Sequence, residues 1–174
     1  AAGAFSTLPM GQVLATVFGR KPQRLPADRS IYRLSGLVSV DGTPATLKTQ
    51  IGPKATIETA KNSEVVFVNG DSAFILRESS RMSLGQQAAT DTLANALRLV
   101  TGKVLAVFSP GKPQRIATAT ATIGIRGTGI YAETDPEETY FCTCYGITDI
   151  NANSDPNARK TVVSRHHDEP VYIL

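Results

Sequence analysis

Short runs of alternating apolar and polar residues recur along most of the chain and are separated by turn residues. A β-rich run over 31–40 ends at the turn pair Asp41-Gly42, and apolar runs at 65–68 and 73–76 flank Asn69-Gly70. Apolar runs on both sides of Asn-Gly are a strong signal for a β-hairpin. We therefore expect tight turns between strands at both places.

Three further segments predict strands in the second half of the chain. Apolar residues surround Thr101-Gly102-Lys103 in the manner of the earlier turns, which predicts another hairpin. The segment 116–125 alternates small, β-branched and apolar residues, which predicts a strand, because branched side chains pack well on a pleated surface. A last strand-like segment, 160–174, follows the polar loop 151–157.

One segment after residue 30 has the spacing of a helix. Between Gln86 and Leu97, apolar residues recur at helical intervals, at Ala88, Ala89, Leu93, Ala94 and Leu97. Elsewhere strands recur every 8–12 residues or so, which is typical of a sandwich, a barrel or a coiled solenoid. The pattern predicts an all-β domain with one short helix.

The chain divides into a short N-terminal segment, 1–29, and a β domain, 30–174. The first segment is small and apolar up to Phe18 and becomes basic from Arg20. Two interpretations stay open for it: a short amphipathic helix, or the remainder of an export signal. We find no boundary inside the β domain.

Composition favours a single folded domain and argues against several other classes of protein. With 174 residues, of which 41% are hydrophobic and 19% charged, the chain has the profile of one folded domain. It has no run of 18 apolar residues, so we expect no transmembrane helix. A net charge of +3 and an aromatic content of 6% do not favour nucleic acid as a partner.

The order of motifs in the predicted strands resembles the FecR domain family. The most specific motif is the Arg-Gly-Thr element within 121–129, where it follows alternating small and β-branched residues. The other motifs lie at 34–40, 51–53, 57–59, 63–67, 74–80 and 102–105. The resemblance covers about residues 30–150.

The resemblance implies an all-β, solenoid-like domain in the periplasm. In the best-known members, such a domain follows a cytoplasmic segment that binds a sigma factor and one membrane helix, and it relays a signal from an outer-membrane transporter. This sequence shows neither of those two segments, so it looks more like the stand-alone exported members. We expect a periplasmic or otherwise exported protein that meets a protein partner in the cell envelope.

The sulfur and imidazole side chains gather near the C-terminus. Cys142 and Cys144 are two residues apart, which places both sulfurs on one face of a strand, opposite Phe141, Thr143 and Tyr145. The only two imidazoles, His166 and His167, follow in the next predicted strand. If the loop 151–157 returns that strand antiparallel, at least one of the two imidazoles comes beside the sulfurs. Thiolates with imidazole are ligands for Zn²⁺ or copper.

Three interpretations of the cysteine pair stay open. The thiols could be buried as small hydrophobic groups, they could form a disulfide or a redox-active dithiol, or they could bind a Zn or Cu ion with His166 or His167. In the metal interpretation, Asp168 could fill a remaining coordination position or orient an imidazole.

Arg126 and Thr128 are candidates for a structural or ligand-binding role. Glycines at 124, 127 and 129 permit a close approach of the backbone, and the Arg126 guanidinium could bind a carboxylate or a phosphate. The structural role is the commoner one, in which Arg126 binds carbonyl groups or an acidic side chain nearby. A buried Arg126 would make its removal cost about 2 kcal/mol or more.

These observations favour a protein that acts by binding and not by catalysis. We expect an exported FecR-like sensor or scaffold domain of the cell envelope, with a metal site near its C-terminal end. The candidate ligands are Cys142, Cys144 and at least one of His166 and His167. The alternative is a metal-dependent or dithiol redox protein that uses the same two cysteines.

Overall fold

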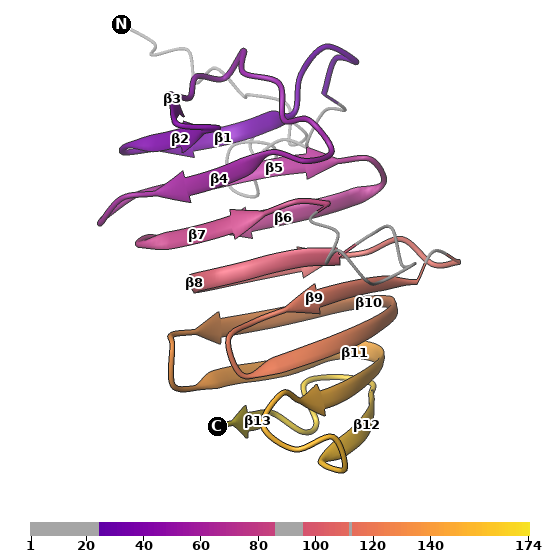
Figure 1. Cartoon of the computed structure of the whole chain (residues 1–174). Coiled ribbons are helices and arrows are strands. Elements are labelled where there is room, and N and C mark those ends of the chain that lie inside the picture. The colour runs from indigo at the N-terminus through magenta and orange to yellow at the C-terminus, as the bar shows by residue number, and fades with distance from the viewer. Residues whose placement is uncertain (1–24, 86–95, 112) are drawn as a thin grey trace, which may run out of the picture.

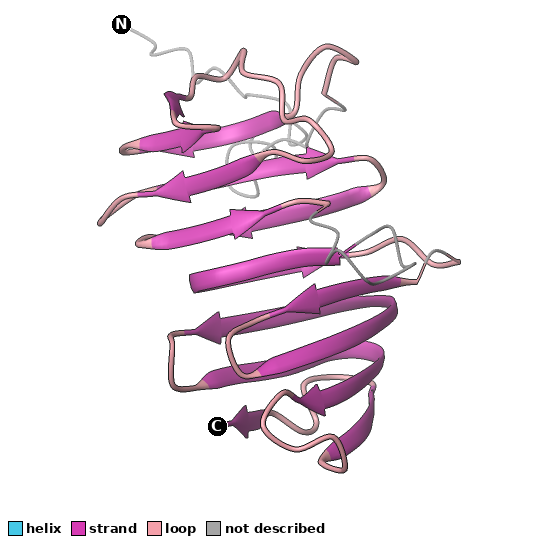
Figure 2. Ribbon diagram, viewed as in Figure 1, coloured by secondary structure: helices cyan, strands magenta, loops and turns pink. Residues whose placement is uncertain are grey.

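The computed structural model describes residues 25–85, 96–111 and 113–174, and within these ranges it contains strands and no helix (Figure 2). The described strands belong to one continuous, almost entirely antiparallel sheet. Their bounds are β1 Ile31–Ser35, β2 Val38–Val40, β3 Thr43–Pro44, β4 Thr56–Thr59, β5 Glu64–Asn69, β6 Ser72–Leu76, β7 Ser80–Ser83, β8 Ala96–Val107, β9 Gln114–Ala117, β10 Ala121–Thr134, β11 Thr139–Ala152, β12 Arg159–Ser164 and β13 Val171–Ile173.

The strands are stacked along one axis, from β1, β2 and β3 at one end to β12 and β13 at the other (Figure 1). The sheet folds into two layers because the long strands β8, β10 and β11 pair with different partners along their two halves. One layer runs β3-β2-β4-β7-β8-β9-β10-β11-β12, and the other runs β1-β5-β6-β8-β10-β11-β13. The fold is all-β, as the strand pattern predicts, and solenoid-like, as the resemblance to the FecR domain family implies.

Strands β10 and β11 pass from one layer to the other at two glycines that lie side by side. Gly127 and Gly146 have φ angles of +57° and +96°, a region that L side chains rarely adopt. A Cβ atom on Gly146 would lie 2.6 Å from the Cβ of Thr128, and one on Gly127 would lie 2.8 Å from the Cα of Pro110. Only glycine fits this bend, and both layers depend on it.

The core lies between the two layers and is filled by alternate residues of the strands. Phe67 and Phe74 stack with ring centroids 4.9 Å apart, and Phe74 meets Phe108 edge to face at 5.7 Å. Burial of each such side chain stabilises the fold by about 1.5–3 kcal/mol. The largest fully buried side chains are Phe67, Phe141, Ile31, Ile57, Leu76, Met82, Leu84, Leu99, Ile116, Ile123, Ile125 and Ile130.

Buried hydroxyl groups connect the strands near the C-terminal end of the stack. The Oγ1 atom of Thr139 lies 2.8 Å from the Oγ1 atoms of both Thr118 and Thr134 and 2.9 Å from that of Thr120. The Thr120 hydroxyl also donates to the carbonyl of Ile173, at 2.9 Å. This network satisfies polar groups inside the fold and ties β13 to the turn before β10.

Two hairpins predicted from turn residues are confirmed. Asp41-Gly42 joins β2 to β3, and Gly70-Asp71 joins β5 to β6, with Asn69 paired to Ser72. The loop predicted at 151–157 also returns the chain antiparallel, because Asn151 pairs with Arg159 and Gly146 with Ser164.

Three local predictions are wrong. Residues 101–103 do not form a hairpin, because β8 runs through them and changes partner from β7 to β6. The segment 116–125 is not one strand, since a turn at 118–120 separates β9 from β10. The segment 160–174 holds two strands instead of one, and each pairs with a different half of β11. At 101–103, the pairing of β8 with β7 and β6 on either side of Gly102 overrides the local turn pattern.

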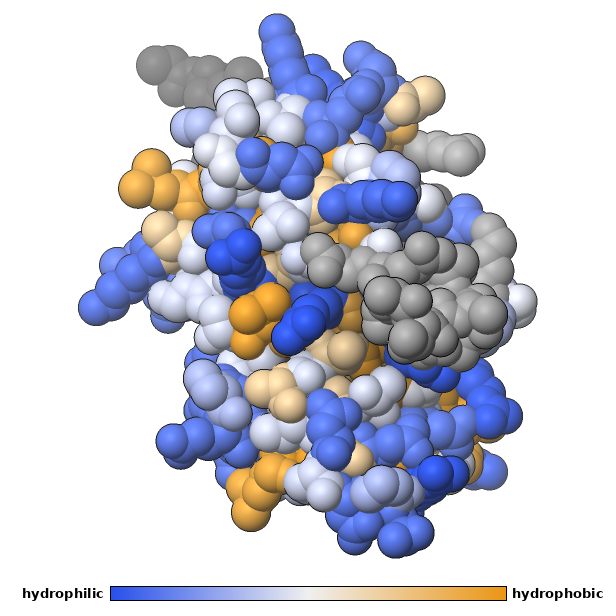
Figure 3. All heavy atoms as spheres, in the orientation of Figure 1, coloured by the Kyte–Doolittle hydropathy of each residue, from blue (hydrophilic) through white to orange (hydrophobic). Residues whose placement is uncertain are grey.

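Two further predictions about local structure fall wholly or partly on residues outside the described ranges. The predicted helix at 86–97 lies outside them as far as residue 95, and its last two residues, Ala96 and Leu97, begin β8. Residues 1–24 of the predicted N-terminal segment also lie outside them. Within the described ranges, no helix of a length and hydrophobicity suited to crossing a membrane is present. On the face shown in Figure 3, hydrophilic side chains predominate and apolar atoms form scattered patches.

Candidate metal centre

Both cysteines lie on the outer side of β11, just before its bend. In this part of the strand Phe141 and Thr143 point into the core, with exposed fractions of 0% and 1%. Thr143 pairs with Ile130 and Tyr145 with Gly129, so Cys144 is an extra residue on β11 and forms a β-bulge. Bulges change the direction of a strand and re-aim its side chains. The two thiols therefore face away from the core, as their spacing predicts.

A turn between β12 and β13 covers the two thiols. Cys142 and Cys144 are 5% and 7% exposed, although they lie outside the core. The N–H of His167 donates to the carbonyl of Cys144 at 2.9 Å, which fixes the turn against the edge of β11. His167 has a φ of +55°, a conformation uncommon for residues other than glycine. This conformation leaves the His167 ring beside the sulfurs.

Asp168 holds the turn that carries His167. Its Oδ2 atom accepts from the N–H groups of Arg165 at 2.7 Å and His166 at 3.3 Å, and from the Ser164 hydroxyl at 3.3 Å. The N–H of Asp168 donates in return to the Ser164 Oγ atom at 3.2 Å. The backbone N–H donors of Arg165 and His166 lower the pKa of the Asp168 carboxyl. Asp168 therefore positions His167 indirectly, by holding the backbone of the turn.

The structure brings Cys142, Cys144 and His167 together, and we call these three residues the Cys–His cluster. Their ligand atoms all lie within 4.8 Å of one another, and the Cys142 Sγ is 3.3 Å from the His167 Nδ1. Bonds of about 2.3 Å to sulfur and about 2.0 Å to nitrogen would place ligand atoms roughly 3.5–4 Å apart around a metal ion. The cluster needs only small adjustments to hold one.

The other residues that the sequence suggested for the site lie outside the Cys–His cluster. The ring of His166 meets that of His167 edge to face, with centroids 5.3 Å apart, but His166 is not one of the three grouped residues. Asp168 is not in the group either, because it closes the turn. The sequence pattern did not reveal the bulge at Cys144 or the role of Ser164. In the sequence, the only sign of the turn that carries His167 is the polar pair Ser164 and Asp168, four residues apart.

Burial controls the chemistry of the two thiols. It raises the pKa of Cys144 to about 11, and it also raises the pKa of Cys142. Both cysteines are free, without a disulfide. Burial and the adjacent Cys142 likewise raise the pKa of Tyr140, on the same outer face of β11. At neutral pH the cluster therefore presents two protonated thiols, which a metal ion would deprotonate on binding.

Arg126 has a structural role, in which it forms an ion pair at the protein surface. Its guanidinium Nη2 lies 2.5 Å from the Oδ2 of Asp149 on the neighbouring strand β11, and the Arg126 side chain is 65% exposed. The Thr161 hydroxyl and Arg126 lower the pKa of Asp149. Arg126 is therefore not buried, because it follows the buried Ile125 in the alternation of β10 and faces solvent, so the cost given for a buried Arg126 does not apply. Thr128 is fully buried, and its hydroxyl donates to the carbonyl of Gly129 at 3.0 Å.

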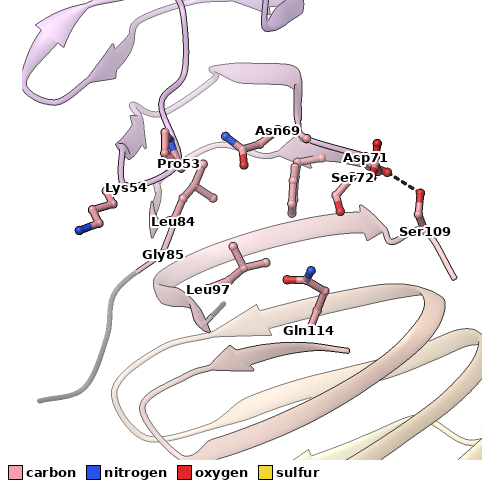
Figure 4. Close-up of a pocket in the computed structure, with 12 residues that line it drawn as sticks. Pro53, Lys54, Asn69, Asp71, Ser72, Leu84, Gly85, Leu97, Ser109 and Gln114 are labelled. Atoms are coloured by element: carbon pink, nitrogen blue, oxygen red, sulfur yellow. Dashed lines mark hydrogen bonds between the residues drawn. The ribbon is translucent and has the colours of Figure 1, made fainter. Parts of the chain in front are cut away.

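A separate cavity of about 310 Å³ lies near the middle of the stack (Figure 4). Lys54 and Asp71 lie on opposite sides of it, and the Ser109 hydroxyl donates to the carbonyl of Asp71 at 2.7 Å. Its lining contains no cysteine or histidine. The cavity offers apolar, amide and hydroxyl groups, together with the charged Lys54 and Asp71, and does not share the sulfur and imidazole ligands of the Cys–His cluster.

Comparison with known families identifies the chain. The model of the family described as FecR protein matches residues 55–144, just over half of the chain. The chain belongs to the FecR family. The match ends at Cys144, so the turn that carries His167 lies beyond the matched region. No curated protein matches the chain.

Two solved structures have a similar fold. Two crystal structures, at 2.50 Å and 1.65 Å resolution, of a proposed anti-sigma factor from Parabacteroides distasonis ATCC 8503 each align with a TM-score of 0.53 and 12% sequence identity. The alignment covers 67% of this FecR-family chain and 58% of the other one. At this identity the likeness concerns the fold.

The exposed position of Arg126 predicts a small effect of its removal. Arg126→Ala should lower the free energy of unfolding by less than about 1 kcal/mol, because a surface ion pair contributes little. Gly127→Ala, one residue away, should cost more than about 1 kcal/mol, because it places a side chain at a positive φ against Pro110. Urea denaturation of the two variants measures both values. An Arg126 variant as unstable as the Gly127 variant would contradict the surface role.

The raised thiol pKa values predict slow alkylation of the metal-free, reduced protein. The thiolate is the reactive form, so both cysteines should react slowly with iodoacetamide at pH 7 and faster as the pH rises through 9 toward 11. Cys144 should react more slowly than Cys142. Mass spectrometry of timed samples gives the two rates, with urea-unfolded protein as the control. Equal rates in the folded and unfolded protein at pH 7 would be inconsistent with burial of the thiols.

Proposed function

We propose that this chain is an exported FecR-type sensor or scaffold domain of the cell envelope. It acts by binding a protein partner, without catalysis, and it holds one Zn²⁺ or copper ion in the Cys–His cluster. The observation that carries the proposal is the convergence of both cysteines of the chain and one of its two histidines within 4.8 Å. Two sulfurs and one ring nitrogen are a ligand set for these metals.

Family membership and fold support a role in protein-mediated signalling. FecR-type anti-sigma factors relay signals through protein contacts, and the aligned solved structures are those of a proposed anti-sigma factor. The C-terminal end of the stack also exposes apolar side chains suited to protein contact. Val163 is 70% exposed, Tyr172 67% and Leu174 75%. Val163 and Tyr172 flank the turn that carries His167, so a metal ion there would lie beside a surface suited to a partner.

The alternative, a dithiol redox protein, receives less support from the same geometry. A redox-active dithiol works through a thiolate with a lowered pKa. Burial raises the pKa of both Cys142 and Cys144, which keeps them protonated and slow to attack a disulfide. A desolvated pair of thiols suits a site in which a bound metal ion supplies the positive charge that stabilises the thiolates.

The metal-binding part of the proposal predicts a stability change. Zn²⁺ at a free concentration 100-fold above its dissociation constant should raise the melting temperature of the reduced protein by about 5–10 °C, because ligand binding to the folded state stabilises it. Cys142→Ser should abolish the shift, since it removes one of the two sulfurs. Differential scanning calorimetry measures these shifts.

His166→Ala is the matched control, because it removes an imidazole one residue from the Cys–His cluster. It should keep the shift of the wild type. A wild type that does not respond to Zn²⁺ or copper, or a Cys142 variant that responds as the wild type does, would overturn the metal-binding proposal. Fractionation that leaves the native protein wholly in the cytoplasm would overturn the envelope location.

A further inference from the structure

We propose that the ion held by the Cys–His cluster is Cu⁺, bound by the two sulfurs and one ring nitrogen of His167 with no fourth protein ligand. This inference rests on the proposed function, since it names the metal of that site. Three properties of the cluster carry it: the number of ligand atoms, their chemical softness and their burial.

The first property is a ligand count of three. Among the described residues, the group of His, Cys, Asp and Glu side chains that converge here contains only Cys142, Cys144 and His167. The adjacent carboxylate, Asp168, uses its Oδ2 atom to hold the backbone of the turn. Recruiting it would loosen the segment that positions His167. Structural Zn²⁺ sites almost always have four ligands in a tetrahedron, so this cluster is one ligand short for Zn²⁺.

The second property is the softness of the ligand set. Two of the three ligand atoms are sulfurs, and soft thiolate ligands favour Cu⁺. Cu⁺ also accepts a trigonal arrangement of three ligands, which matches the count. The 3.3 Å separation between the Cys142 Sγ and the His167 Nδ1 is close to what adjacent ligands of one ion require.

The third property is burial, which limits water as a replacement ligand. The sulfurs belong to side chains that are 5% and 7% exposed, under a turn fixed by the hydrogen bond from His167 to Cys144. A Zn²⁺ ion held by three protein ligands would need a water molecule in the fourth position. A trigonal Cu⁺ ion needs none.

The net charge of the occupied site favours Zn²⁺ over Cu⁺, but this effect is weaker than that of the missing fourth ligand. Zn²⁺ with two thiolates is neutral, whereas Cu⁺ with two thiolates carries one negative charge, which burial disfavours. The cluster lies outside the hydrophobic core and His167 is exposed, so solvent beyond the imidazole ring reduces this penalty without a water molecule having to bind the ion. The missing fourth ligand affects Zn²⁺ alone, and we therefore assign Cu⁺.

A competition experiment tests the assignment. Reduced protein is titrated under argon with Cu⁺ supplied as its bathocuproine disulfonate complex, and in parallel with Zn²⁺ alone. The wild type should remove one equivalent of Cu⁺ from the chelator, and Cu⁺ should displace Zn²⁺ from Zn²⁺-loaded protein. X-ray absorption of the Cu⁺ form should show two sulfur neighbours and one nitrogen neighbour.

The variants separate the cluster from nonspecific thiol binding. Cys142→Ser and Cys144→Ser should each weaken Cu⁺ binding at least 100-fold, and His167→Ala at least 10-fold, whereas the matched His166→Ala should change it less than twofold. Four neighbours in the absorption spectrum, equal effects of the two histidine variants, or Zn²⁺ that Cu⁺ does not displace would overturn the assignment. If Cu⁺ does not displace Zn²⁺, the assignment of Cu⁺ is wrong but the proposed metal site stands. Failure of both metals to bind would overturn the proposed function as well.

Discussion

The bend that β10 and β11 make at Gly127 and Gly146 is the constraint on which the rest of this structure depends. At this bend two strands leave one layer of the sheet and enter the other, so a single continuous ladder of hydrogen bonds can enclose a core. The two glycines lie against Thr128 and Pro110 at distances that exclude a Cβ atom. Arg126, just before the bend, faces solvent by the alternation of β10, and Thr128, just after Gly127, is fully buried.

The Cys–His cluster is a consequence of that bend. The chain accommodates the change of layer partly through the bulge at Cys144, two residues before Gly146. β12 then ends opposite Gly146, and the chain must turn around the same edge to begin β13. The turn stabilised by Ser164 and Asp168 makes this second crossing and brings His167 over the sulfurs. The path of the strands around the bend thus positions all three side chains.

The sequence predicts the class of fold and the composition of the cluster well, and the detailed path of the chain less well. Asp41-Gly42 and Asn69-Gly70 act locally, so their hairpins could be predicted. Gly102 has the same local pattern, but β6 and β7 pair with β8 on either side of it and keep it within one strand. The spacing of Cys142 and Cys144 placed both sulfurs on one face. The choice of His167 over His166 depends on a left-handed backbone conformation that no residue pattern specifies.

The central claim is that one metal ion binds to Cys142, Cys144 and His167 together. NMR spectroscopy of the reduced protein loaded with ¹¹³Cd²⁺, as a magnetically active substitute for the native ion, tests this claim most directly. The account predicts a single ¹¹³Cd signal with scalar couplings to the β-protons of both cysteines and to the ring protons of His167. Coupling to only one cysteine, or to His166 in place of His167, would contradict it.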